Sequence, residues 1–353
     1  MCGPAARRFL FDPSVSKTYS RIPIPVRTFR ASAPNPKGVT ATMASKTLSS
    51  SKNTGASARS PRSTLRRQGW VTGVLMVLPY TIFFLLFSLI PIVYGFGVSF
   101  YDWSLLGDKT FVGLQNYTNL MQDEEFRTNL LNTVLFTLVS VPLMTGLGLL
   151  LAVLVNSIRK GQAFLRIAFF MPYVLSVSVI SSIWVIFLQP YTGLLNRILR
   201  GIGLINNEIF WLSDSTLAWV SIIMATLWWT MGFVFVLFLA GLQDIPESFY
   251  EAAGLEGANR WQTFRYVTFP SLSRVTVLVV ILQTISSFKI FGQSKLITGG
   301  GPAGATKTVV FSIYENGFQT FQMGYASAIA FVLMLVILVI SLLQTFLMRK
   351  IGE

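Results

Sequence analysis

The residues that could do chemistry in this chain are few, and their types exclude most kinds of active site. The 353 residues include no histidine and one cysteine, Cys2. Histidine–metal sites, serine–histidine triads and imidazole acid–base catalysis are therefore excluded, as are an intrachain disulfide and a cysteine-rich metal cluster. We expect no catalytic residue, no metal site and no cofactor, and the chain is not predicted to be an enzyme.

Polar and aromatic side chains inside apolar segments are the candidates for a binding site. Two threonines four positions apart share one helical face, and two aromatic residues beside them could stack on a sugar ring. A pair of serines lies at a comparable depth in another apolar segment. The predicted solute site comprises Thr226, Trp229, Thr230, Phe233, Ser286 and Ser287. A structural role stays open, because serine and threonine also hydrogen-bond to carbonyls of their own helix.

A second candidate lies in residues 241–264, which separate two apolar segments. Asp244 is predicted to cap a short helix there, which Gly254 and Gly257 end. The pair Asn259 and Gln262, three positions apart, predicts a second cap. Ordering two short helices joined at a glycine costs more conformational entropy than a simple tether would.

Aromatic residues and mixed charge favour docking of this segment to a cytoplasmic protein. Phe249, Tyr250 and Trp261 offer apolar contacts, and four acidic residues oppose binding to anionic lipid. The alternative is a pair of amphipathic helices that lies on the membrane surface.

The composition indicates that the apolar segments that carry the predicted solute site lie in a membrane. The chain is 52% hydrophobic and 12% charged, whereas a soluble domain has about 25% charged residues. An all-α integral membrane protein is therefore predicted. Six stretches have the roughly 20 apolar residues of a membrane helix: about Val71 to Phe100, Leu130 to Val155, Leu165 to Leu188, Leu217 to Leu242, Val275 to Ile297 and Tyr325 to Met348.

The distribution of basic residues predicts the orientation of these spans. Cytoplasmic loops carry an excess of lysine and arginine. The loops after the second and fourth spans and the C-terminus are basic, with Arg159, Lys160, Arg166, Arg260, Arg265, Arg274, Arg349 and Lys350, whereas the loop after the first span is acidic. Both termini are therefore predicted to lie in the cytoplasm, in a multi-pass protein of the cell (inner) membrane.

The N-terminal segment differs in composition from the rest. Residues 1–69 carry 13 basic residues and one acidic residue, whereas residues 70–353 carry 15 and 13. We predict a disordered basic cytoplasmic tail over 1–69 and a six-helix membrane domain over 70–353. A transit peptide and a true start at Met43 stay open. The nearly balanced charge of the domain argues against nucleic-acid binding.

Several motifs resemble the permease subunits of ATP-binding-cassette (ABC) importers. Glu251-Ala252-Ala253, Gly257 and Phe269-Pro270 resemble the EAA motif of these subunits, on a loop before the penultimate span. The motifs at Phe111–Tyr117, Thr298–Pro302 and Gly324–Ala328 resemble the sugar-permease branch, the relatives of the maltose and glycerol-3-phosphate importers. The resemblance covers about residues 70–350, with Glu256 and Gly292 at positions where the family often has aspartate.

The resemblance implies a fold and a set of partners. It implies six transmembrane helices with a cytoplasmic coupling helix between helices 4 and 5, where Glu251, Ala252, Ala253 and Gly257 contact an ATPase dimer. It also implies a second homologous permease subunit and an extracytoplasmic solute-binding protein. The family's sugar sites lie on the two helices that flank the EAA loop, which agrees with the predicted solute site.

The implied function is import of a carbohydrate, such as a sugar, an oligosaccharide or a related polyol, powered by ATP hydrolysis on a separate subunit. Import of glycerol-3-phosphate or a glycerophosphodiester is an alternative. A stand-alone secondary transporter and a membrane-embedded enzyme are remote alternatives, since inverted halves and clustered acids within the spans are not recognisable.

Three further signals are weaker. Lys289 lies within the predicted fifth span, where it could pair with an anionic solute or extend to the outer surface. Residues 299–304 with Lys307 resemble a phosphate loop but lack its Gly-Lys-Ser/Thr ending, so we expect a turn that the binding protein approaches. Gly146 and Gly148 predict close helix packing.

Overall fold

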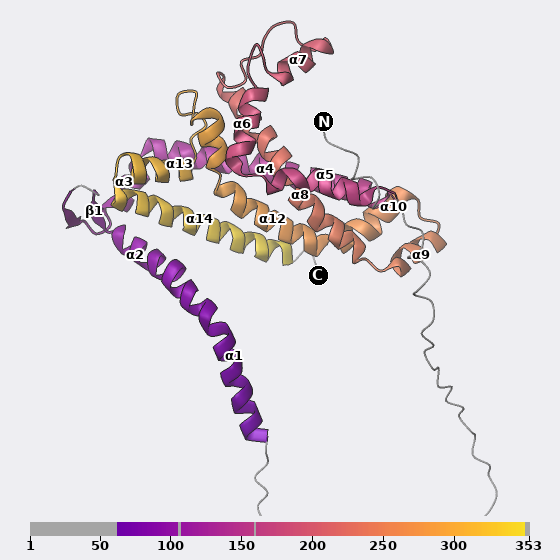
Figure 1. The fold of residues 1–353 in the computed structure, drawn as a ribbon, viewed down its shortest axis with the longest axis horizontal. Coiled ribbons are helices and arrows are strands. Elements are labelled where there is room, and N and C mark those ends of the chain that lie inside the picture. Colours follow the sequence, from indigo (N-terminus) through magenta and orange to yellow (C-terminus); the bar gives the residue numbers. More distant parts are fainter. Residues whose placement is uncertain (1–61, 105–106, 159, 350–353) are drawn as a thin grey trace, which may run out of the picture. The chain divides into compact units, whose positions relative to one another are not determined.

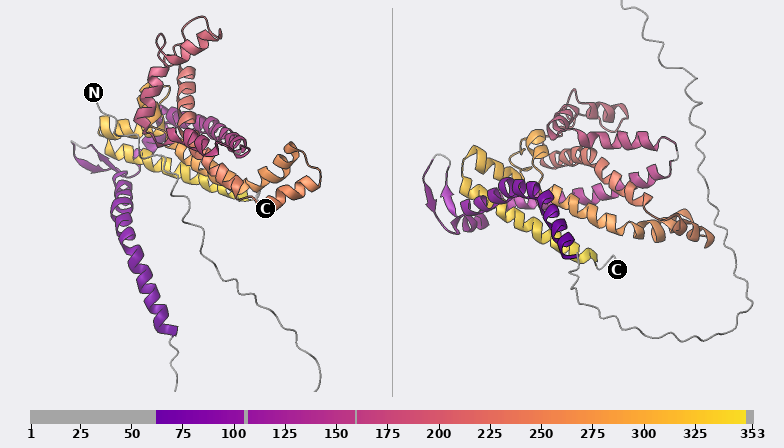
Figure 2. Two further views of the ribbon diagram at one scale, coloured as in Figure 1. Left: turned by 45° about the vertical axis from the view of Figure 1, so that its right-hand side comes forward. Right: turned by 60° about the horizontal axis from the view of Figure 1, so that its bottom comes forward.

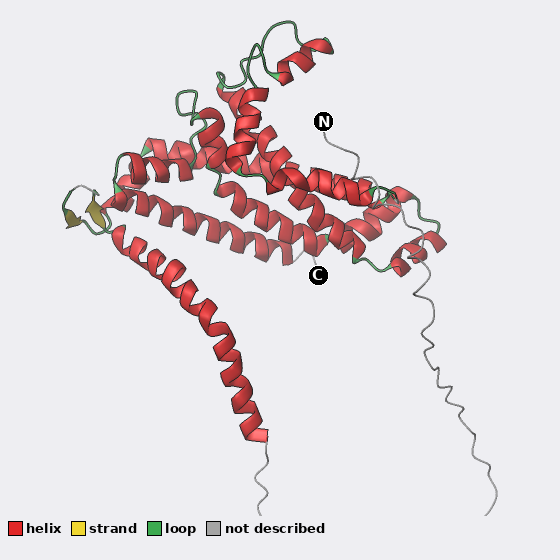
Figure 3. Cartoon of the chain, in the orientation of Figure 1, coloured by secondary structure: helices red, strands yellow, loops and turns green. Residues whose placement is uncertain are grey.

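The described part of the protein is almost entirely helical. A computed structural model describes residues 62–104, 107–158 and 160–349 (Figures 1 and 3). Residues 1–61 of the predicted tail lie outside the described residues. Helix α1 (Arg62–Phe84) begins inside the predicted tail, since arginine and glutamine are good helix formers and extend a helix begun by the apolar residues. By contacts the chain divides into two units, Met1–Arg66 and Arg67–Glu353.

Four helical stretches in the described residues are long and apolar enough to cross a membrane. They are residues 73–98, α4 (Glu124–Asn156), α8 (Ser215–Gln243) and α14 (Met323–Arg349). The first passes through α1, a π-helical turn (Leu85–Leu89) and α2 (Ile90–Val98). Its side chains along 73–90 are nearly all exposed in this chain, as expected of a segment whose surroundings are lipid or another subunit.

Two bent pairs of helices could each form a further span. The predicted third span consists of α5 (Gln162–Val174) and α6 (Val177–Phe187), which meet at 97°. The break follows Pro172, and the Ser176 side chain caps α6 by accepting a hydrogen bond from Val179 N. The predicted fifth span begins on α12 (Ser273–Phe288), and the helical residues 260–271, which precede that prediction, meet α12 at 63°. The described residues thus hold four to six candidate spans.

The predicted fifth span is shorter than its hydropathy suggests. Helix α12 ends at Phe288, and Lys289 forms its C-terminal cap with its N–H bonded to Ser286 O at 3.2 Å. Lys289 therefore stands at the end of the helix rather than within it. The chain continues through a π-helical turn (Ser294–Thr298), α13 (Val309–Tyr314) and a second π-helical turn (Glu315–Gln319).

The core of the bundle is built on α4 and α8. These two helices pack together, α5 covers α8, and α12 lies on α4 (Figure 2). A Cβ at Gly148 would lie 2.5 Å from Val234 Cγ1, which confirms close packing at that position. A Cβ at Gly146 would meet nothing within 4 Å, so the close packing of this region is at Gly148.

The segment after α2 adds a small hairpin to the predicted all-α fold. Strands β1 (Tyr101–Trp103) and β2 (Lys109–Phe111) pair antiparallel, with Tyr101 opposite Phe111. The Lys109 ammonium lies 4.4 Å from the centroid of the Tyr101 ring. Helices α3 (Gln115–Gln122) and α7 (Leu194–Gly201) complete the elements outside the candidate spans, apart from the segment between α8 and α12.

Candidate functional site

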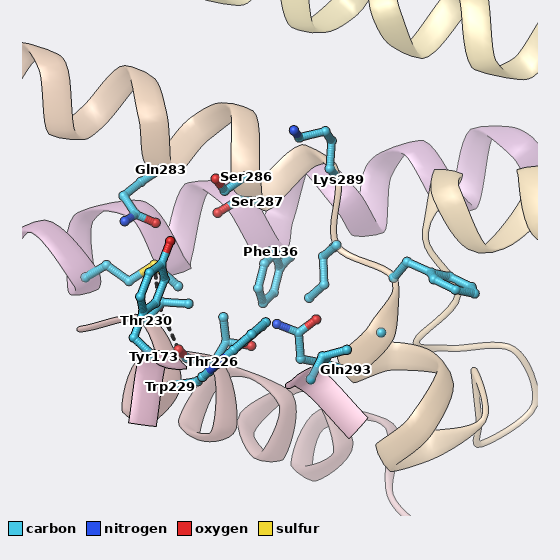
Figure 4. A pocket seen from close by; sticks show the side chains of 15 residues that line it. Phe136, Tyr173, Thr226, Trp229, Thr230, Gln283, Ser286, Ser287, Lys289 and Gln293 are labelled. Carbon is cyan, nitrogen blue, oxygen red and sulfur yellow. Dashed lines mark hydrogen bonds between the residues drawn. The ribbon is translucent and has the colours of Figure 1, made fainter. Parts of the chain in front are cut away.

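A cavity of about 620 Å³ lies where α4, α5, α6, α8 and the end of α12 converge (Figure 4). It contains five of the six residues predicted to bind a solute. Its volume falls within the range of roughly 300–1,000 Å³ typical of small-molecule sites. The cavity is lined by Phe136, Met144, Tyr173, Val177, Thr226, Trp229, Thr230, Gln283, Ser286, Ser287, Lys289, Ile290, Phe291, Gly292 and Gln293.

The two threonines present hydrogen-bond acceptors to this cavity. Thr226 Oγ1 donates to Ile222 O and Thr230 Oγ1 donates to Thr226 O, each at 2.7 Å. Their hydroxyl hydrogens are therefore committed to their own helix, as the structural alternative anticipated. The remaining lone pairs of the two oxygens can still accept hydrogen bonds from a solute hydroxyl.

The two serines differ in their surroundings. Ser287 is buried and its Oγ lies 3.2 Å from the Oγ of the buried Ser140 on α4. Ser286 is exposed to the cavity. Ser140 thus holds the Ser287 hydroxyl in place, whereas Ser286 can turn its hydroxyl toward a bound molecule.

Two glutamines supply the most versatile polar groups, and the sequence analysis missed both. Gln283 and Gln293 line the cavity at 5% and 7% exposure. Within the described residues neither side-chain amide has a hydrogen-bond partner, so each offers two N–H donors and one oxygen acceptor. Gln283 precedes Ser286 by three positions and so shares its helical face, a spacing that could have identified it.

The aromatic residues form one wall, but Phe233 is not part of it. Phe233 stacks on Tyr173 with the ring centroids 5.1 Å apart and the planes at 16°, and Tyr173 is the ring that lines the cavity. Tyr173 lies on another helix, so spacing along α8 does not reveal it. Trp229 Nε1 donates to Leu175 O at 3.1 Å, at the break between α5 and α6, which fixes the indole against that break.

The second candidate site is the segment between α8 and α12. Helix α9 (Glu247–Leu255) ends in a Schellman motif: Ala258 N bonds to Ala253 O at 2.9 Å and Gly257 N to Gly254 O at 3.1 Å. Gly257 has a φ of +78°, a conformation that costs little only for glycine. Gly257 ends the helix as predicted, whereas Gly254 lies within it.

The start of this segment differs from the sequence prediction, and its second half agrees with it. Asp244 does not cap α9: it ends α8, and Pro246 stands at the N-cap position of α9. The error arose because α8 continues to Gln243. A capping box of Asn259 and Gln262 opens α10 (Arg260–Thr263), as predicted. A π-helical turn (Phe264–Thr268) and α11 (Phe269–Ser271) lead from α10 to α12.

The four predicted coupling residues do not share one surface. Glu251, Ala252 and Gly257 are exposed, whereas Ala253 is 8% exposed and packs inward. Leu255, at 91% exposure, lies among the exposed residues. The segment therefore presents a carboxylate, small residues and a large apolar side chain on its outside, a surface suited to fit into a partner protein.

The glycine-rich loop before α13 is tied down by side chains from other elements. Asn132 Nδ2 donates to Ala305 O at 3.1 Å and to Lys307 O at 3.0 Å. Lys307 Nζ lies 2.9 Å from a Glu125 oxygen and 2.8 Å from a Glu315 oxygen. The N–H groups of Gly300 and Gly301 bond within the loop, so they are not free to cradle a phosphate.

The charge of Lys307 is stabilised by its two carboxylate partners. Burial alone would lower its pKa, but the hydrogen bonds and charges of Glu315 and Glu125 outweigh burial and raise the pKa above the ordinary 10.5. A raised lysine pKa means that the contribution of this contact to stability is fully present below the unfolded pKa and is lost as the pH rises through the folded pKa.

Replacing Lys307 by methionine is expected to loosen the loop. The change removes two ion pairs at a cost of about 1 kcal/mol, because one partner is well exposed. Hydrogen–deuterium exchange over residues 299–308 should become faster in Lys307→Met. Lys109→Met, which removes a lysine from the hairpin instead, should leave exchange in this loop unchanged. Equal exchange in all three proteins would show that the ion pairs do not hold the loop.

Comparison with known proteins identifies relatives across most of the chain. Residues 124–353 match the family described as binding-protein-dependent transport system inner membrane component. The chain is 36% identical to the probable ABC transporter permease protein YurN of Bacillus subtilis, over 76% of this chain and 94% of that protein. It is 34% identical to the trehalose/maltose transport system permease protein MalF of Thermococcus litoralis, over 75% of this chain and 90% of that protein.

A solved structure shares the fold. A chain of the bacterial alginate ABC transporter, crystallised in complex with an alginate pentasaccharide-bound periplasmic protein, superposes with a TM-score of 0.72 at 23% identity. The match covers 83% of this chain and 98% of that chain.

Proposed function

The chain belongs to the family of binding-protein-dependent transport system inner membrane components, and on this premise we propose that it is the permease subunit that moves a carbohydrate into the cytoplasm. The solute would be a sugar, an oligosaccharide or a related polyol. The protein is a transport component of the inner membrane, and ATP hydrolysis would take place on a separate ATPase subunit.

The cavity is the observation that carries this proposal. Carbohydrates present many hydroxyl groups and an apolar ring face, so their sites need both donors and acceptors together with aromatic surface. The free amides of Gln283 and Gln293, the acceptor oxygens of the threonines and the ring of Trp229 supply these groups around one cavity. The names of relatives that transport trehalose and maltose add support.

The segment between α8 and α12 supports the proposed coupling to an ATPase dimer. Helix α9 with its glycine joint would enter a cleft of the ATPase, and closure of the ATPase dimer would be transmitted through residues 260–271 to α12. Helix α12 carries Gln283, Ser286 and Ser287, so movement of this helix would alter the cavity directly. With both termini in the cytoplasm, the chain would cross the membrane six times, with α5 and α6 together as the third span and α12 as the fifth.

The remaining proposed partners occupy the other surfaces. An extracytoplasmic binding protein would deliver the solute at the side of the glycine-rich loop. A second homologous permease subunit would pair with this one, and lipid would surround both. Transport that continues without an ATPase would favour the remote alternative, a stand-alone secondary transporter.

Uptake of labelled carbohydrates by cells that carry the whole transporter tests the site. Thr230→Val and Ser287→Ala should each lower uptake about fivefold, since a lost hydrogen bond costs about 1 kcal/mol. Trp229→Ala should lower it further, because it removes both the ring and the bond to Leu175. Glycerol-3-phosphate and a glycerophosphodiester belong in the same screen as the alternative solutes.

Matched variants separate binding from stability. Thr276→Val removes a hydroxyl that bonds to its own helix at 3.0 Å outside the cavity, and Trp228→Ala removes the neighbouring indole, which packs near Trp184. Both should transport normally. Unchanged uptake in all three cavity variants, at equal membrane abundance, would remove this cavity as the solute site.

A further inference from the structure

The cavity contains one formal charge and no counter-charge. Among the residues that line it, Lys289 is the only lysine, arginine, aspartate or glutamate. It is exposed, and no ion pair or hydrogen bond engages its ammonium within the described residues. In Figure 4 it lies at the rim of the cavity, beyond Ser286 and Ser287 on the same chain segment, with its ammonium turned away from the other labelled residues.

The ammonium groups of the other two lysines of this region have partners. The ammonium of Lys307 is neutralised by Glu125 and Glu315. That of Lys295 lies 4.8 Å from the centroid of the Phe311 ring and 5.2 Å from that of Tyr314. Only Lys289 of the three has neither a carboxylate nor an aromatic face, and only Lys289 lines the cavity.

In the described residues, the helices that line the cavity have acidic residues only at or beyond their ends. One turn beyond Lys289, a Cβ at Gly292 would lie 2.6 Å from Val177 Cγ2, so a side chain is excluded there. The acidic residues of α4 and those that flank α8 lie at the helix ends: Glu124 and Glu125 in the first turn of α4, Asp214 before α8 and Asp244 after it. Helices α5, α6 and α12 contain no acidic residue.

A solute that fills the cavity would therefore have an unpaired cation at the rim, which the flexible lysine side chain can turn toward it (Figure 4). Water hydrates Lys289 while the cavity is open. A neutral carbohydrate would offer only hydroxyl oxygens to the ammonium, which leaves its positive charge uncompensated. A carboxylate or phosphate on the solute would replace the water with a charge-assisted hydrogen bond, which is among the stronger polar contacts.

We propose that the transported solute is an anionic carbohydrate or polyol, with a carboxylate or phosphate group that binds Lys289 while the glutamines and Trp229 hold its hydroxyl-bearing part. The proposal rests on the proposed function of the cavity and narrows its substrate class. Lys289 is thereby a residue that determines specificity for charge.

Binding to the purified whole transporter, permease pair with its ATPase, tests this assignment. The probes are two pairs that differ mainly by the anionic group: galactose with galacturonate, and glycerol with glycerol-3-phosphate. Binding is measured by equilibrium dialysis with labelled probes. We expect at least one anionic member to bind about tenfold or more tightly than its neutral partner, and the pair that shows the preference identifies the group as carboxylate or phosphate.

The variants assign the preference to one side chain. Lys289→Met should abolish the preference for the anion, and Lys289→Arg should retain most of it. Lys295→Met, which removes the same charge nearby but outside the cavity, should bind like the native protein. Equal binding of neutral and anionic probes would overturn the inference. It would also be overturned by a preference that survives in Lys289→Met, because the partner subunit would then determine the charge of the site. Neither result would contradict carbohydrate transport. If none of the four probes, nor maltotriose, binds, both the inference and the proposed function fail.

Discussion

Gly257→Asp is expected to abolish transport while the protein remains in the membrane. At a φ of +78°, any L-residue other than glycine costs about 1–2 kcal/mol. A Cβ at this position would meet no atom of the chain within 4 Å, so the substitution creates no clash in the permease itself. It alters the end of α9 and adds a charge to the surface that we propose enters the ATPase. Uptake, membrane abundance and co-purification of the ATPase measure the result.

Three companion variants separate the conformational effect from the charge. Gly257→Ala carries only the conformational cost and should retain part of the transport. Gly254→Ala, three positions earlier and inside α9, favours the helix by about 1 kcal/mol and should transport normally. Glu251→Lys reverses an exposed charge that has no hydrogen bond in the described chain, and should lose the ATPase without losing the fold. Normal co-purification and uptake in Gly257→Asp and Glu251→Lys would contradict the docking role.

Hydropathy predicted the apolar segments well but not where they bend. A window of about 20 residues averages α5 and α6 into one span, although Leu175 and Ser176 are extended and the two helices meet at 97°. The same averaging joined α12 to the turn after it and so placed Lys289 inside a helix. Breaks of this kind depend on caps and on contacts with other helices, which a hydropathy window does not contain.

Helical spacing predicted part of the cavity correctly. Thr226, Trp229 and Thr230 fall on its wall because they share one face of α8. Phe233 lies one turn further along that face, but Tyr173 of α5 stacks on it and takes the place at the cavity surface. Ser286 and Ser287 were predicted because they lie at a depth comparable to that of the threonines, and both line the cavity. The contact of Ser287 with Ser140 joins residues 147 positions apart, and spacing within one helix cannot reveal it.

Gly232→Val is expected to destroy the cavity by separating α5 from α8. A Cβ at Gly232 would lie 2.1 Å from Phe169 O and 2.9 Å from Phe170 Cα. Both are backbone atoms of a helix, so they cannot move aside as the end of a flexible side chain can. The Trp229–Leu175 hydrogen bond and the Phe233–Tyr173 stack cross the same contact and would be lost with it.

The matched control is Gly146→Val on α4, where a Cβ would meet nothing within 4 Å. Both substitutions replace a helical glycine with the same β-branched residue, so the intrinsic helix propensity changes alike and only the packing differs. Overpacking typically costs 1–3 kcal/mol, and a contact of backbone with backbone should cost at least about that much. Gly232→Val should therefore give little monodisperse protein, a lowered melting temperature and no uptake, whereas Gly146→Val should behave like the native protein. If Gly232→Val were as stable and active as Gly146→Val, the close approach of α5 to α8 would not be what holds the aromatic wall of the cavity in place.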